Sequence, residues 1–168
     1  MHLSSEIKLL KKYYMPLDFE KFVAKGNEFI NSLDHELGNK GREYASRILR
    51  SVFRAIRSKL SVSESIDLIS QLPMALKAVY VDGWKPVKDT QPVFSIYDLS
   101  DEIIRQDGLA AWRDFSGRDE AIVALKAVMK TLSNYVSFGE MRHVIAIFPS
   151  PVKEEMMELI KPRFQTQN

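Results

Sequence analysis

The side chains most often used in catalysis and metal binding are few in this sequence, and their spacing suits neither task. His2 lies at the N-terminus, and neither His35 nor His143 has a ligand-type residue four positions away that would complete a metal-binding pair on a helix. Asp34 and Glu36 are neighbouring carboxylates, but such close positions point to different sides of a helix. No cysteine is present, which excludes thiolate catalysis, thiolate metal ligation and disulfides. The sequence therefore favours a protein without enzymatic activity, metal or cofactor.

A row of arginines is the strongest candidate for a binding site. Arg47, Arg50, Arg54 and Arg57 follow one another at intervals of three, four and three residues, so they share one face of a helix predicted over 43–60. Guanidinium groups in such a row match phosphate oxygens, and the alternative function is therefore a module that binds nucleic acid or another polyanion. The competing interpretation is a solvated face, which we favour because no aromatic residues alternate with the arginines.

Three aromatic residues are candidates for a surface that binds a partner protein. Tyr80 and Trp84 stand at the start of the connection between two helical regions, and Trp112 lies near the end of a later helix. Such side chains either anchor a loop on the core or remain exposed for a partner. The leading hypothesis is a non-enzymatic interaction or assembly protein that forms a homo-oligomer or binds another protein.

The composition is that of an ordinary globular chain. The 168 residues carry a net charge of +2, with 45% hydrophobic and 27% charged residues. No apolar run reaches the roughly 20 residues that a membrane-spanning helix needs. The N-terminal residues do not follow the pattern of a secretory signal. These features predict a cytoplasmic protein without a membrane partner.

An internal duplication organises the elements that carry these candidates. Gly41–Tyr80 aligns without a gap on Gly117–Met156, and ten of the forty aligned positions are identical. In each copy an amphipathic stretch meets a Ser-x-x-Glu sequence, Ser61 with Glu64 and Ser137 with Glu140, which is the pattern of a capping box at the start of a helix. A proline follows each of the short helices that these boxes begin. The repeat therefore predicts two similar helical units.

The predicted architecture is all-α, with two tandem, diverged repeats of about four helices each. The units are expected to pack with pseudo-two-fold symmetry. The predicted segments are an N-terminal helix over 1–16, a first repeat over 17–82, a connection over 83–98, a second repeat over 99–162 and a tail over 163–168. The connection is assigned from its prolines, its glycine and its missing helical period.

The order of these features resembles the bacterial family called domain of unknown function 2267 (DUF2267). The resemblance rests on the helix "REYASRILRSVFRAIRSKL", the ending "SQLP", the later "VDGWKP" and "PVFSIYDLSDEI", and the second unit opening "RDEAIVALKAVM". It covers roughly residues 19 to 157. The second copy departs from the pattern, with "AIFPSP" where a "QLP"-like sequence is expected. The resemblance implies an all-helical bacterial domain, and it supplies no assigned activity and no catalytic residues.

Overall fold

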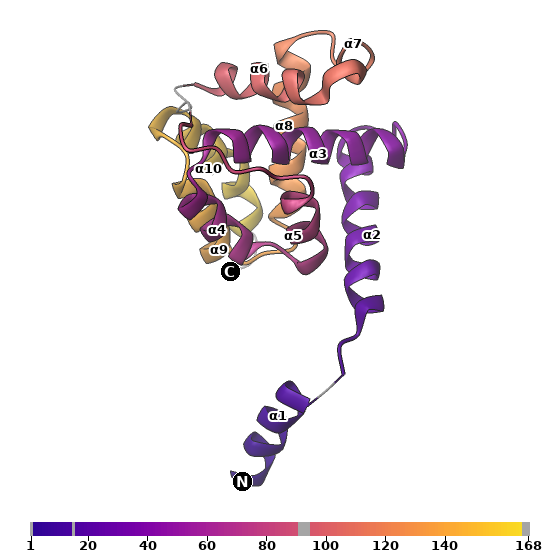
Figure 1. The fold of residues 1–168 in the computed structure, drawn as a ribbon, viewed down its shortest axis with the longest axis vertical. Helices are drawn as coiled ribbons and strands as arrows, with labels where there is room; N and C mark the ends of the chain where they lie inside the picture. Colours follow the sequence, from indigo (N-terminus) through magenta and orange to yellow (C-terminus); the bar gives the residue numbers. More distant parts are fainter. Residues whose placement is uncertain (1, 15, 91–94, 166–168) are drawn as a thin grey trace.

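The helices follow one another along almost the whole chain (Figure 1). The computed structural model describes residues 2–14, 16–90 and 95–165, with side-chain positions for 5–11, 16–90 and 95–161. Within these ranges every regular element is helical, which confirms the all-α prediction. The elements are α1 (His2–Tyr14), α2 (Phe19–Glu36), α3 (Arg42–Lys59), α4 (Val62–Gln71), α5 (Met74–Val81), α6 (Ile96–Asp107), the 3-10 turn η1 (Gly108–Ala110), α7 (Ala111–Asp114), α8 (Arg118–Leu132), α9 (Phe138–Ala146) and α10 (Ser150–Gln165).

Local signals set the ends of the helices from α2 to α5. The side chain of Asp18 accepts a hydrogen bond from the backbone N–H of Lys21 and caps the start of α2. Ser61 and Glu64 form the predicted capping box at the start of α4. Pro73 then stands directly before α5, where its fixed φ of −55° suits the entry to a helix.

In the second half of the chain, α6 begins earlier than the sequence analysis expected. The predicted helical unit started at residue 99, whereas α6 starts at Ile96, inside the predicted connection over 83–98. The cause is a further capping box, in which Ser95 and Asp98 satisfy each other's backbone N–H groups. Gly108 ends α6 with a φ of 62°, and the capping box of Ser137 with Glu140 begins α9 as predicted.

A single buried cluster joins both halves of the chain. Helix α3 runs across the molecule in Figure 1, with α6 packed on one side of it and α5 on the other. Helices α2 and α6 each contact both α3 and α8, and α4 contacts α9. The fully buried side chains come from all of these regions: Phe29, Leu33, Ile48, Leu76, Tyr80, Leu99, Ile103, Leu125, Met129, Leu132, Met141 and Ile145. The two halves therefore share one core.

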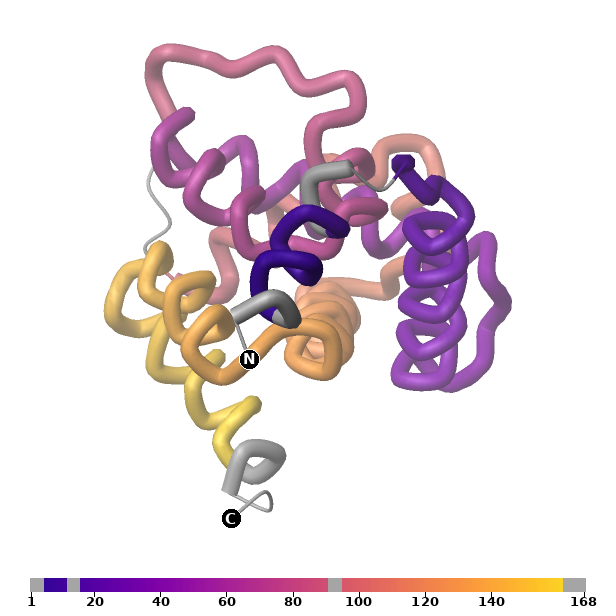
Figure 2. Tube along the Cα trace, turned by 90° about the horizontal axis from the view of Figure 1, so that it is seen from below, coloured from indigo at the N-terminus to yellow at the C-terminus, as the bar shows by residue number. Residues whose placement is uncertain are grey.

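Two segments lie outside this bundle. Helix α1 stands apart from the other helices in Figure 1. The residues after α5 form an open arc along one side of the bundle, which Figure 2 shows at the top. A search of the described residues for a helix long and apolar enough to cross a membrane found none.

Candidate functional site

The structure divides the four predicted arginines among different environments. Arg47 forms an ion pair with Asp114, from Nε to Oδ2 at 2.7 Å and from Nη2 to Oδ1 at 2.9 Å. The Asp114 side chain is only 2% exposed, and Arg47 lowers the pKa of its carboxyl group chiefly through these hydrogen bonds. Arg47 thus has an internal partner and holds α7 against α3.

Arg57 is tied to the end of α5. Its Nη1 donates hydrogen bonds to the backbone carbonyls of Tyr80 and Asp82, the second at 2.9 Å. Carbonyls at a helix C-terminus carry partial negative charge and favour a cation there. The pKa of Arg57 is nevertheless lowered, first by burial and then by the positive charge of Arg54. Two guanidinium groups are therefore close enough to repel each other.

The remaining two arginines are not used by the fold in this way. Within the described part of the chain, the side chains of Arg50 and Arg54 have no hydrogen bond or ion pair. Arg50 is exposed and borders a separate groove between α2, α3 and α5, of about 310 Å³. Arg54 is half-buried and lies beside Arg57. The row thus does not form one continuous cationic track.

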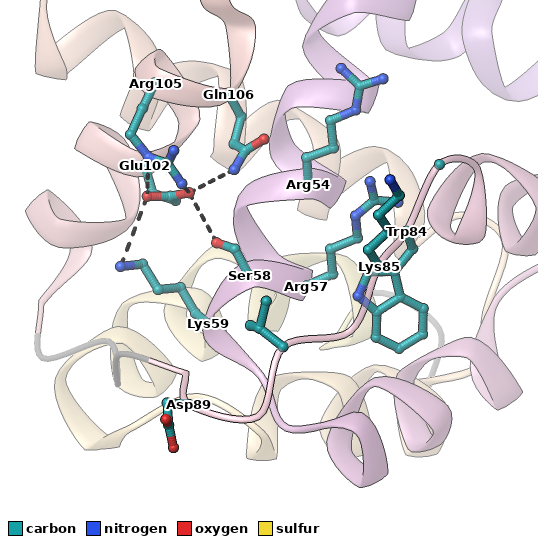
Figure 3. Close-up of a pocket in the computed structure, with 12 residues that line it drawn as sticks. Arg54, Arg57, Ser58, Lys59, Trp84, Lys85, Asp89, Glu102, Arg105 and Gln106 are labelled. Atoms are coloured by element: carbon teal, nitrogen blue, oxygen red, sulfur yellow. Dashed lines mark hydrogen bonds and ion pairs between the residues drawn. The ribbon is translucent and has the colours of Figure 1, made fainter.

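Arg54 and Arg57 instead line a cleft between α3, α6 and the segment after α5 (Figure 3). The cleft has a volume of about 480 Å³, within the usual range of small-molecule sites. Five of its lining side chains are basic and two are acidic. The lining residues are Arg54, Arg57, Ser58, Lys59, Gly83, Trp84, Lys85, Val87, Asp89, Glu102, Arg105 and Gln106.

The charges of this cleft are arranged unevenly. In Figure 3, Arg57 of α3 lies beside Trp84 and Lys85, which come from the opposite wall, and Arg54 extends from the same helix one turn away. We call Arg54, Arg57 and Lys85 the cationic end. The two acidic residues, Asp89 and Glu102, lie away from this end in the same view. An anion is thus favoured at the cationic end and disfavoured at the other.

Glu102 neutralises the basic residues at the other end of the cleft. Its carboxylate accepts hydrogen bonds from Arg105, from Gln106 at 2.8 Å and from Ser58 at 3.0 Å, and Lys59 Nζ lies 3.9 Å away. Burial alone would raise the pKa of Glu102, but these hydrogen bonds outweigh it and lower the pKa. Lys59 and Arg105 are therefore already paired, and the cationic end holds the charge that remains.

The candidate partner residues have three different positions. Tyr80 is fully buried, and its hydroxyl shares a hydrogen bond of 2.9 Å with Ser65; burial raises its pKa to about 12. Tyr80 is thus a core residue and not part of the candidate partner surface, because it lies on the inward face of α5 near its end. Trp84 is half-buried, and its ring meets Tyr80 edge to face at 5.9 Å. Trp112 is 84% exposed beside η1, where Leu109 is 95% exposed.

The sequence analysis missed several residues that line the cleft. Lys59 and Lys85 were not singled out, and neither were Glu102, Arg105 and Gln106 of α6. One signal was present, since Trp84 and Lys85 are adjacent in the connection. Nothing in the spacing of the sequence shows that this dipeptide faces Arg54 and Arg57.

No curated protein matches the chain. A family model described as "Uncharacterized conserved protein (DUF2267)" matches residues 26–158. This match covers most of the chain and includes all the helices that line the cleft. The chain therefore belongs to the DUF2267 family.

Proposed function

We propose that this chain is a helical binding module that holds a phosphate-bearing anion in the cleft between α3 and α6. The observation that carries the proposal is the cationic end. Arg54, Arg57 and Lys85 line this end of the cleft, and among the described residues Arg54 has no acidic partner. Bringing like charges together costs free energy, which an anion between them offsets. Charge-assisted hydrogen bonds from guanidinium groups suit phosphate oxygens.

Titration calorimetry with inorganic pyrophosphate at low ionic strength tests this proposal. Binding should weaken about tenfold or more in Arg54→Gln, because a hydrogen bond to a charged group contributes roughly 1.5–3 kcal/mol. Arg50→Gln is the matched control, since Arg50 lies on the same helix, is exposed and borders the other groove. The proposal is wrong if the wild-type protein does not bind pyrophosphate, or if the two variants lose affinity equally.

A second proposal is that the chain assembles with a protein partner, and it rests on a surface separate from the cleft. Leu109 and Trp112 expose large apolar side chains at one corner of the molecule, beside η1 and α7. Exposed tryptophan and leucine side chains of this kind are typical of protein contacts. We take a second copy of this chain as the partner, because two-fold homodimers are the commonest assemblies. Light scattering over a concentration series should show a dimer that Trp112→Ser disrupts, and a monomer at every concentration would contradict this.

A third proposal concerns the internal duplication that the sequence predicts. We infer that α2–α5 and α6–α10 are two diverged copies of one unit, related by a pseudo-two-fold axis. The contacts between helices support this, since α2 and α6 each pack on both α3 and α8, and α4 packs on its counterpart α9. In an experimental structure, superposing α3–α4 on α8–α9 should bring α5 onto α10. Helices that do not overlap after that superposition would contradict the duplication.

A further inference from the structure

We propose that the ligand of the cleft is a small organic phosphate monoester with a planar ring, of the size of a mononucleotide, rather than a nucleic-acid strand. This inference rests on the proposed anion site and names the class of ligand that it takes. It has three parts: one phosphate position, a limited volume, and an aromatic wall next to the cations.

The cations without an acidic partner are few and lie at one end of the cleft. A strand of nucleic acid presents phosphates in series and needs a series of free cations along its path. Here Arg47 is occupied by Asp114, and Arg50 borders a different groove. What remains is Arg54 and Arg57, three residues apart on α3, with Lys85 from the facing segment. A small group of cations at one end of the cleft suits one terminal phosphate better than a series of phosphates, because the oxygens of one phosphate accept several hydrogen bonds.

The cleft also limits the size of the ligand. Its volume of about 480 Å³ accommodates a molecule of mononucleotide size. The lining also includes the uncharged residues Val87, Ser58 and Gln106, which can contact an uncharged organic body. Away from the cationic end, Glu102 already engages Arg105 and Lys59, so that part of the cleft attracts a second phosphate less than the cationic end does. The arrangement therefore favours one phosphate followed by a neutral group.

Trp84 supplies the aromatic wall. It lines the cleft beside Lys85 and remains half-exposed. Its contact with Tyr80 has an interplanar angle of 77°, and an edge-to-face contact leaves at least one face of the indole uncovered by Tyr80. Because Tyr80 is fully buried and also packs on Phe53, the indole rests on a fixed support. A planar ring of the ligand can stack on such a surface, as bases do on aromatic side chains.

The test compares four probes on the full-length protein by titration calorimetry: adenosine 5′-monophosphate, ribose 5-phosphate, inorganic pyrophosphate and a 20-base-pair DNA duplex. The monophosphate nucleotide should bind about fivefold or more tightly than ribose 5-phosphate, which lacks the ring. Trp84→Leu should remove this difference and leave ribose 5-phosphate binding unchanged. Arg54→Gln and Lys85→Gln should weaken both ligands, whereas Arg50→Gln should weaken neither.

The outcomes separate this inference from the proposed function. One outcome is that pyrophosphate binds through Arg54 while the wild-type protein binds the nucleotide and the sugar phosphate equally. In that outcome the proposed anion site stands, and the inference that the ligand carries a planar ring is wrong. If the duplex binds more tightly than the nucleotide and Arg54→Gln abolishes its binding, the ligand is a polyanion and this inference is overturned. If no probe binds, both fail. In a Trp112→Phe variant Trp84 is the only tryptophan of the sequence. Adding the nucleotide should then change the tryptophan fluorescence.

Discussion

Arg47 and Asp114 are 67 residues apart in the chain and form a two-pronged ion pair that fastens α7 to α3. The carboxylate is almost fully buried, so losing the arginine leaves a charge with little access to water. Arg47→Gln should therefore lower the free energy of unfolding by roughly 1.5–3 kcal/mol. Urea unfolding measures this, with Arg50→Gln as the control because exposed substitutions usually stay within about 0.5 kcal/mol. Equal stability of the two variants would show that the pair contributes nothing.

Asp107 is the one described residue with a buried side-chain oxygen, Oδ2, that lacks a hydrogen-bond partner. Burial raises its pKa first, and the neighbouring charge of Asp114 adds to this, although Ser51 donates to Oδ1 at 2.8 Å. The folded state then binds a proton more strongly than the unfolded state. Stability attributable to Asp107 should fall as the pH rises from its ordinary value, 3.8, through its raised pKa.

Asp107→Asn removes this titration and should raise stability at neutral pH by about 1 kcal/mol, since a new amide donor can meet the Asp114 carboxylate. Asp114 contributes the opposite dependence, because its lowered pKa stabilises the fold above the ordinary value and that contribution is lost in acid. Urea midpoints of both proteins between pH 4 and pH 8 measure the effect of Asp107, and midpoints below pH 4 measure that of Asp114. A variant less stable than wild type at pH 8 would contradict the prediction.

Tyr80→Phe should cost roughly 1–3 kcal/mol, because it leaves the fully buried hydroxyl of Ser65 without its partner. It should also change the behaviour in alkali. Burial raises the pKa of Tyr80 to about 12, so above pH 10 the unfolded state loses its proton first and stability falls with rising pH. The variant should lose less stability between pH 10 and pH 11.5 than wild type does. Identical slopes for the two proteins would be inconsistent with this role.

Gly26 marks the closest approach of α2 and α5. A Cβ atom added there would lie 2.8 Å from the Cβ atom of Ala75, which cannot move aside as a flexible side chain would. Gly26→Ala gains about 1 kcal/mol of helix propensity but overpacks the contact at a cost of about 1–3 kcal/mol. We expect a net loss of stability, which Ala75→Gly in the double variant should partly restore. Thermal unfolding of the four proteins in a double-mutant cycle measures the coupling.

The predictions from sequence succeeded where the determining interactions are local. Ser61 with Glu64 and Ser137 with Glu140 lie within one helical turn, so the letters alone identify the starts of α4 and α9. The start of α6 was misplaced because the apolar period becomes clear only at Leu99, while Ser95 and Asp98 form a capping box with aspartate in place of glutamate.

The candidate site depended on contacts between distant residues, and for this reason the sequence described it only in part. Helical spacing correctly placed the four arginines on one helix. It carried no information that Asp114 would occupy Arg47, or that Trp84 and Lys85 would face Arg54. Tyr80 was misassigned because the end of a helix next to a loop is as often exposed as buried, and here Phe53 and Ser65 enclose it.

The continuous buried cluster means that neither the part of the chain before residues 83–90 nor the part after them has a complete core of its own. Helix α6 fills the space between α3 and α8, so cutting the chain within residues 83–90 would leave each fragment with an open apolar face. Neither fragment should fold alone, yet the two mixed together should reconstitute the bundle at a rate that depends on their concentration. The 83–90 segment then sets the effective concentration of one half around the other. Its length would tune how fast the protein folds while leaving the contacts of the finished core unchanged.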